Sequence, residues 1–369
     1  MLILQPRPRH TQRDPRPKEV TMTDRSEATL DLNQLARLSA AVLTLGLILS
    51  VFGVAEADQS AVDEARQLLE AGKISEAEYL LQDAIEKDSS DEEAFLLLAK
   101  VYLYKQDHDK AIKYAERAVK INAEVSDYHL WLARAYLAKA MESNIFNAFR
   151  YARKGKGEYE KAVRLDSTNI DALFELCMYL VAAPWLAGGD NDRGIELAQA
   201  ITERDSLYGA YAWAGIWEHD GKLDRAEDAL QTAVKLDTSS AFYARYALGY
   251  FYERHERFEE ALGVFKDILE TKPDAVSAVY QVGKIHLLTG KNLEEAEACF
   301  KRYLEVEPPP NAPSWASAHW RLGLVYDLQG RLVLAAEEIR KAVELDPDNE
   351  QYRRSLKDIE KKLKASGGE

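Results

Sequence analysis

The stretch KAVELDP, from Lys341 to Pro347, has the pattern of the last turns of an amphipathic helix that a proline ends. Four related stretches occur earlier in the chain: AIEKD at Ala84, AVKIN at Ala118, AVRLD at Ala162 and AVKLD at Ala233. Ala84 and Ala118 are 34 residues apart. A fixed spacing of this size predicts a row of repeated helical units, each closed by one such stretch.

The last copy shows the unit most completely. A first helix that carries Leu322-Gly323 and Tyr326 is interrupted at Gly330, and a second helix ends before Pro347. Along the second helix the apolar positions are Ala335, Ile339 and Ala342. This order resembles the tetratricopeptide repeat, in which small residues are needed where helices cross and large ones fill the gaps. The resemblance implies an all-α fold, a superhelical solenoid of about eight repeats over residues 58–348.

Two of these repeats are longer than the other six. In the third, Ala162 follows Ala118 by 44 residues, and the extra length lies near MESNIFNAFRYARKGK (141–156), so that both helices or their connection should be longer. The fourth replaces the usual turn with AAPWLAGGDNDRG (182–194). There we expect Pro184 to end the first helix, Gly188-Gly189 to permit positive φ, and Asp190 or Asp192 to cap the second helix.

Both ends of the chain differ from the repeats. Residues 349–369, rich in Lys, Arg and Glu, are predicted to form a capping helix and a tail, because a terminal repeat needs a polar cover. Residues 1–57 are predicted to be a disordered leader followed by a signal peptide or membrane anchor. The run Leu38–Ala55 is uncharged, is preceded by Arg37 and is followed by Ala55-Glu56-Ala57, the pattern of a cleavage site.

This N-terminal pattern leaves two locations open. Cleavage near Ala57 gives a periplasmic or secreted protein, whereas retention of residues 38–55 gives an inner-membrane anchor with the repeats outside the cytoplasm. The true start is Met1 or Met22. On these grounds the resemblance is to an exported bacterial tetratricopeptide repeat protein.

Composition and motifs argue against several classes of function. The formal net charge of −14 disfavours nucleic acid as a partner. The sequence contains no phosphate-binding loop, zinc-binding cysteine pair or hydrolase nucleophile motif, so we expect no enzyme activity, no cofactor and no metal. Cys177 and Cys299 lie in different repeats and are interpreted as small buried residues.

Three sets of polar residues admit a functional and a structural interpretation. His286 and His319, on the first helices of adjacent repeats, could share a metal or serve packing. Asp190-Asn191-Asp192 superficially suggests a calcium loop but lacks its bidentate glutamate, which favours helix capping. The basic residues of the third repeat could attract an acidic partner or lipid head groups, or could form a solvated helix face; they are Arg150, Arg153, Lys154 and Lys156.

The resemblance implies that the first helices line a concave groove. At the groove positions of the family, the C-terminal repeats carry mostly aromatic residues, and the predicted partner-binding set is Tyr208, Tyr211, Tyr243, Tyr246, Tyr250, Tyr280, Gln281, Lys284, Trp320 and Arg321. Aromatic rings offer large contact area at low entropic cost. The alternative is that some of these tyrosines pack between helices.

Some members of the family hold a peptide's C-terminal carboxylate with Lys, Asn and Arg side chains. The matching positions here are Leu96, Lys100, Leu130, Arg134 and Tyr246, with no asparagine, so this clamp is not predicted.

Taken together, the residues and the resemblance predict a non-enzymatic scaffold that binds a protein or peptide in its concave groove, in the bacterial periplasm. Two alternatives remain, a membrane-tethered scaffold for envelope complex assembly and an aromatic-lined groove for a glycan or small ligand.

Overall fold

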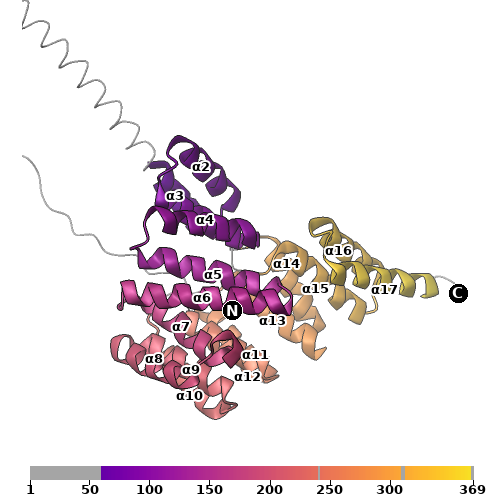
Figure 1. Ribbon diagram of the computed structural model, residues 1–369. Coiled ribbons are helices and arrows are strands. Elements are labelled where there is room, and N and C mark those ends of the chain that lie inside the picture. The colour runs from indigo at the N-terminus through magenta and orange to yellow at the C-terminus, as the bar shows by residue number, and fades with distance from the viewer. Residues whose placement is uncertain (1–59, 240–241, 309–311, 367–369) are drawn as a thin grey trace, which may run out of the picture.

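A computed structural model describes residues 60–239, 242–308 and 312–366 of the chain (Figure 1). The predicted leader, the segment 38–55 and the cleavage site near Ala57 lie outside these residues. The described part contains helices and no strand, so the predicted all-α class is confirmed. Among the described helices, none combines the length and the apolar character needed to cross a membrane.

Pairs of helices follow one another from the first repeat to the last. Residues 60–70 are helical and precede α2 (Ile74–Lys87). The next pairs are α3 (Glu92–Tyr104) with α4 (His108–Ile121), α5 (Ser126–Glu142) with α6 (Ile145–Leu165), α7 (Ile170–Ala182) with α8 (Asn191–Arg204), and α9 (Ser206–His219) with α10 (Leu223–Leu236). The remaining pairs are α11 (Tyr243–Arg254) with α12 (Phe258–Thr271), α13 (Val276–Thr289) with α14 (Leu293–Leu304), and α15 (Trp315–Leu328) with α16 (Leu332–Leu345).

The recurring alanine lies at a close crossing of helices. In each of the five quoted copies it is at most 1% exposed: Ala84, Ala118, Ala162, Ala233 and Ala342. Glycine serves the same purpose on the facing helix, since a Cβ on Gly323 would lie 2.4 Å from Cγ1 of Ile339. The repeated stretch therefore exists because each second helix must fit closely against its neighbours.

The recurring tyrosine of the first helix links each repeat to the one before it. At four joints its hydroxyl donates a hydrogen bond to a glutamate on the preceding second helix: Tyr102 to Glu78 at 2.6 Å, Tyr136 to Glu116 at 2.5 Å, Tyr252 to Glu227 at 2.7 Å and Tyr326 to Glu297 at 3.3 Å. At three of these joints a basic residue also pairs with the same glutamate, as Lys105 does with Glu78 at 2.6 Å. We call these contacts the tyrosine–glutamate joints.

The stack curves with its first helices inside. First helices of neighbouring repeats contact one another directly, as α3 does with α5, α7 with α9 and α13 with α15. Second helices pack mainly between the first helix of their own repeat and that of the next. Figure 1 shows the resulting superhelix winding from the indigo N-terminal repeats to the yellow C-terminal ones. The concave surface is consequently lined by the first helices.

Helix α17 (Glu350–Ser366) covers the end of the stack, which confirms the predicted capping helix. Its apolar side chains face the last repeat, with Tyr352 and Ile359 buried. Its outer side is polar, and Lys362 pairs with Asp327 of α15 at 2.6 Å. Helix α17 therefore covers part of the apolar surface of the final repeat.

In the third repeat, the extra length goes into both helices. Helix α5 has 17 residues and α6 has 21, while Ser143 and Asn144 alone connect them. The two long helices pack closely at Gly155, where a Cβ would lie 2.9 Å from Cγ of Leu137. The hairpin they form therefore extends beyond its shorter neighbours.

In the fourth repeat, α7 ends before Pro184, and a short 3-10 helix, η1 (Trp185–Ala187), follows. Gly188 has a φ of 93°, and Asp190 caps α8 by accepting from the backbone N–H of Arg193 at 3.1 Å, as expected. The expectation for Gly189 was wrong, because its φ is not positive. Gly189 is instead needed for close approach, since a Cβ there would lie 1.8 Å from the carbonyl oxygen of Ala183.

Candidate concave binding surface

The predicted partner-binding residues lie on the first helices α9, α11, α13 and α15, in four separate groups. Tyr243, at 38% exposed, is the one residue of the set among the exposed large hydrophobic side chains of the described chain. At the other extreme, Tyr280 is 2% and Gln281 is 4% exposed, so both belong to the packed interior. The remaining members are half-buried.

On α9, Tyr208 and Tyr211 meet edge to face, with ring centroids 6.3 Å apart. The hydroxyl of Tyr208 donates to Asp171 of α7 at 2.8 Å. The hydroxyl of Tyr211 is buried and has no hydrogen-bond partner in the described part of the chain. Burial raises the pKa of both phenols, and the carboxylate of Asp171 adds to the effect at Tyr208.

On α11, Tyr246 and Tyr250 stack with ring centroids 6.2 Å apart. Both rings rest on Phe265 of the second helix α12, and the hydroxyl of Tyr250 accepts a hydrogen bond from Nε2 of Gln281 at 3.1 Å. Burial raises the pKa of Tyr246 to about 12. Lys284, one turn beyond Gln281, forms an ion pair with Glu253. These contacts join the inner surfaces of α11 and α13.

On α13 and α15, Tyr280 and Arg321 are bound to each other. Arg321 Nε donates to the Tyr280 hydroxyl at 2.7 Å, and that hydroxyl also contacts Ser317 Oγ at 2.7 Å. Trp320 donates from its indole nitrogen to Ser355 of α17 at 3.0 Å and lies beside the ring of Tyr352. Trp320 therefore has a packing role against the capping helix.

The N-terminal half of the concave surface holds a cation pair that the sequence prediction did not include. Lys100 Nζ of α3 lies 4.6 Å from the centroid of the Trp131 ring of α5, and the guanidinium of Arg134 lies 4.2 Å from the same centroid. Arg134 is neutralised by Glu175 of α7, with its Nε donating at 2.8 Å. Lys100 has no carboxylate within ion-pair distance in the described residues. We call Lys100, Trp131 and Arg134 the α3–α5 cation site.

The Lys100 side chain is half-buried. Burial, with the positive charge of Arg134 added to it, lowers the pKa of Lys100 to about 8. Lys100 occupies a position that matches the carboxylate clamp of the family. The sequence could not show that it lacks an ion-pair partner, because this depends on residues one and two repeats away. The clamp as such is still not present, since Leu96 and Leu130 are buried apolar residues.

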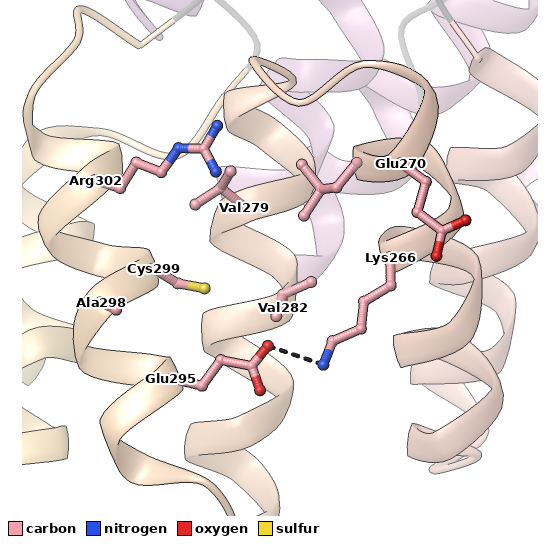
Figure 2. Close-up of a pocket in the computed structure, with 9 residues that line it drawn as sticks. Lys266, Glu270, Val279, Val282, Glu295, Ala298, Cys299 and Arg302 are labelled. Atoms are coloured by element: carbon pink, nitrogen blue, oxygen red, sulfur yellow. Dashed lines mark ion pairs between the residues drawn. The ribbon is translucent and has the colours of Figure 1, made fainter.

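The outer side of the stack contains a pocket of about 450 Å³ between α12, α13 and α14. Figure 2 shows Val279 and Val282 at its base and the Lys266–Glu295 ion pair, 2.8 Å long, across its mouth. Cys299 also lines it, but burial raises the pKa of this thiol to about 11. A thiol with this pKa carries little thiolate at neutral pH, so the pocket lacks an activated nucleophile.

The alternatives for the polar residues can now be compared with the structure. His286 and His319 each lie beside a glutamate of their own repeat, Glu295 and Glu338 respectively. Residues 60–239, 242–308 and 312–366 contain no cluster of three or more His, Cys, Asp or Glu side chains suited to a metal ion. Cys177 and Cys299 are free thiols. His286 and His319 thus contact glutamates of their own repeats, and the two cysteines are not joined to each other.

The paired helices, the curved stack and its inner wall define a helical-repeat solenoid with a binding surface. Two sequence models described as tetratricopeptide repeat match residues 220–278 and 280–350, and residues 68–135, together more than half of the chain. The chain belongs to the tetratricopeptide repeat family, which confirms the family part of the resemblance.

Known proteins with similar sequences are long. Superkiller complex protein 3 of Mus musculus is 24% identical over 364 residues, covering 87% of this chain and 22% of that protein. Its Homo sapiens counterpart is 23% identical over 261 residues, covering 60% and 16% respectively. The chain thus spans about a fifth of the length of these relatives, or less.

Among solved structures, the human IFIT1 dimer with PPP-AAAA superposes with a TM-score of 0.51 at 16% identity, over 86% of this chain and 78% of that one. This likeness supports the solenoid fold alone.

Proposed function

We propose that this protein is a non-enzymatic scaffold that binds a peptide segment of another protein along its concave surface, with a carboxylate of the partner at the α3–α5 cation site. The family supports the class of function, because tetratricopeptide repeats are interaction modules. The observation that carries the proposal is Lys100, a half-buried ammonium group beside Trp131 and Arg134 that has no carboxylate within ion-pair distance in the described residues.

Partial burial beside Arg134 disfavours the charged form of Lys100 in the free protein, and the carboxylates of Asp127 and Glu93 offset this only in part. Within the described residues neither lies close enough to form an ion pair with it as a counter-ion. A partner carboxylate would supply that counter-ion, so the cost is recovered on binding. Farther along the same surface, Tyr243, Tyr246 and Tyr250 present aromatic area to the rest of the peptide. The packed residues Tyr280 and Gln281 would shape the wall without contacting the partner.

The proposal can be tested with a display library of random peptides panned against the full-length protein. We expect enrichment of peptides with Asp, Glu or a free C-terminal carboxylate. Lys100→Met should abolish this preference while the protein stays folded, because methionine fills a similar volume without charge. Lys235→Met, on the exposed surface of α10, is the matched control and should leave the enrichment unchanged.

The pH dependence follows from the pKa of Lys100, about 8 in the free protein. Below this pH the ammonium is already protonated, and affinity for an acidic peptide should be constant. Above it, affinity should fall by about tenfold per pH unit, until the pKa of the bound state is reached. An affinity that is independent of pH between 7 and 9, or an equal peptide set for Lys100→Met, would contradict the carboxylate assignment.

Export from the cytoplasm is a further part of this proposal. It is supported by the uncharged run 38–55 and the small residues around Ala57. Mass spectrometry of the mature protein would distinguish the two locations. A chain that begins at Asp58 indicates a periplasmic or secreted scaffold, and an intact chain indicates a membrane-tethered one.

The glycan alternative rests on the same aromatic residues of α11. A glycan array bound by the wild type and not by Tyr246→Ala, together with no enrichment of peptides, would favour that alternative.

A further inference from the structure

The tip of the long α5–α6 hairpin carries large apolar side chains that nothing covers in the described residues. Met141 is 78%, Ile145 is 65% and Phe146 is 86% exposed. Trp185 of η1 is 80% exposed. Figure 1 shows helices α5 and α6, in magenta, lying side by side in the stack. Exposed side chains of this size, gathered in the two irregular repeats, indicate a contact with something outside the chain.

The same region is basic in a protein of net charge −14. The first half of α6, Ile145 to Gly157, contains no acidic residue and four basic ones: Arg150, Arg153, Lys154 and Lys156. Of these, Lys156 alone lies near a carboxylate in the described part of the chain, that of Glu160 at 3.8 Å. Glu142, the acidic residue beside the tip, is paired with Lys139 at 2.8 Å. The first half of α6 is therefore positively charged, and three of its four cations have no carboxylate within ion-pair distance in the described residues.

Apolar and basic residues alternate along α6, and η1 packs against this helix. Phe146, Arg150 and Arg153 follow one another at helical spacing, so they share one side of α6 over about 10 Å. Arg153 donates from Nε and Nη2 to the backbone oxygen of Leu186, at 2.9 and 2.6 Å. This contact fixes η1, the segment that carries Trp185, against α6 at Arg153. We call Met141, Ile145, Phe146, Arg150, Arg153 and Trp185 the α6 edge patch.

We propose that the α6 edge patch binds the surface of a membrane that contains anionic phospholipids. Phe and Trp partition into the boundary between head groups and acyl chains, and arginines beside them pair with phosphates. Most of its side chains stand exposed on the long α5–α6 hairpin, an arrangement that suits contact with a fluid surface. The acidic remainder of the chain is repelled by such a membrane, so this edge is the one that would face it.

The experiment uses the full-length chain, labelled with an environment-sensitive fluorophore at Met141→Cys and mixed with phosphatidylcholine vesicles, with or without phosphatidylglycerol, that carry a lipid-attached quencher. The label at Tyr79→Cys, an exposed position on α2, is the positional control. Because the readout is local, binding through residues 38–55 alone leaves it unchanged. We expect quenching at position 141 that requires phosphatidylglycerol, and none at position 79.

Arg150→Gln should weaken the phosphatidylglycerol-dependent quenching about fivefold, the contribution of one cation near an anionic surface. Lys235→Gln, which removes an exposed cation elsewhere, should have no effect. Replacing Phe146 and Trp185 by Ser should remove the phosphatidylglycerol-dependent quenching of the label at position 141. Equal quenching at positions 79 and 141, quenching without phosphatidylglycerol, or no quenching at all would overturn the proposal, the last outcome favouring an acidic protein as occupant.

Discussion

Glu175 shows how a single side chain can join two repeats. One of its carboxylate oxygens accepts from Nε of Arg134 at 2.8 Å and the other from the Tyr159 hydroxyl at 2.5 Å. Arg134 is buried on α5 and Tyr159 on α6, so the carboxylate of α7 closes the third repeat onto the fourth. An ion pair whose cation is buried is costly to break, because the buried charge that remains has no counter-ion.

Glu175→Ala should therefore lower the free energy of unfolding by about 3 kcal/mol. Urea denaturation followed by circular dichroism measures this loss. Glu360→Ala, which removes the exposed Arg340–Glu360 pair, is the control and should cost less than about 1 kcal/mol. Equal losses for the two variants would mean that Arg134 finds another partner or reaches water.

The sequence predicts which residues occupy the characteristic positions of the repeat, but it does not predict which residues they contact. The alanines, the glycines and the recurring tyrosine were predicted because the repeat pattern places them. Tyr280 was assigned to the groove by its position, yet its hydroxyl partners Ser317 and Arg321 lie 37 and 41 residues farther along the chain. The isolation of Lys100 depends in the same way on α5, so position alone did not show it.

Among the elements, α6 differs most from the regular repeats. It contains two glycines two residues apart that meet different surroundings. A Cβ at Gly155 would lie 2.9 Å from Cγ of Leu137 and 3.2 Å from the carbonyl oxygen of Ala133, whereas at Gly157 no atom lies within 4 Å. The first glycine is needed for helix packing, and the second only weakens the helix.

Gly157→Ala should raise the free energy of unfolding by about 0.5–1 kcal/mol, since alanine loses less backbone entropy in a helix. Gly155→Ala has the same intrinsic benefit but must displace Leu137, so we expect a net loss of stability. Thermal unfolding of the two variants side by side measures the difference. Stabilisation by both would show that α5 and α6 separate easily.

Turn chemistry explains why the element boundaries were predictable. Gly188, Asp190 and Pro184 have backbone requirements that a reader of the sequence can recognise, and the structure places each as expected. Gly189 was assigned the wrong requirement because positive φ and close approach both select glycine. The direction in which the long hairpin projects depends on the stacking of α5 against α4, which no single segment encodes.

The whole molecule is a row in which each repeat contacts its neighbours. Hydrophobic clusters follow the chain in order, from the one around Leu98 through that around Phe265 to the one around Phe300. The number of repeats and the capping helix were predictable from periodicity, since a row needs only local rules. Stability in such a row is a sum of local terms.

Ile359→Ala, a change in the buried side of α17, tests this independence. Its loss of about 3 kcal/mol should fall on the last repeats alone. Hydrogen exchange measured by mass spectrometry should show reduced protection in α15, α16 and α17 and unchanged protection in α3 and α4. Lys361→Ala, on the exposed side of α17, should leave both regions unchanged. Reduced protection along the whole chain would instead indicate one cooperative unit.

The tyrosine–glutamate joints have a mechanical consequence. Each of these four contacts lies between two rigid helix pairs, so a small rotation at one joint needs no change inside either pair. We therefore expect the stack to be elastic. Pulling its two ends apart should change the angles between neighbouring repeats before any helix unwinds. Tension would then alter the pitch of the inner wall, and with it the spacing offered to whatever lies there.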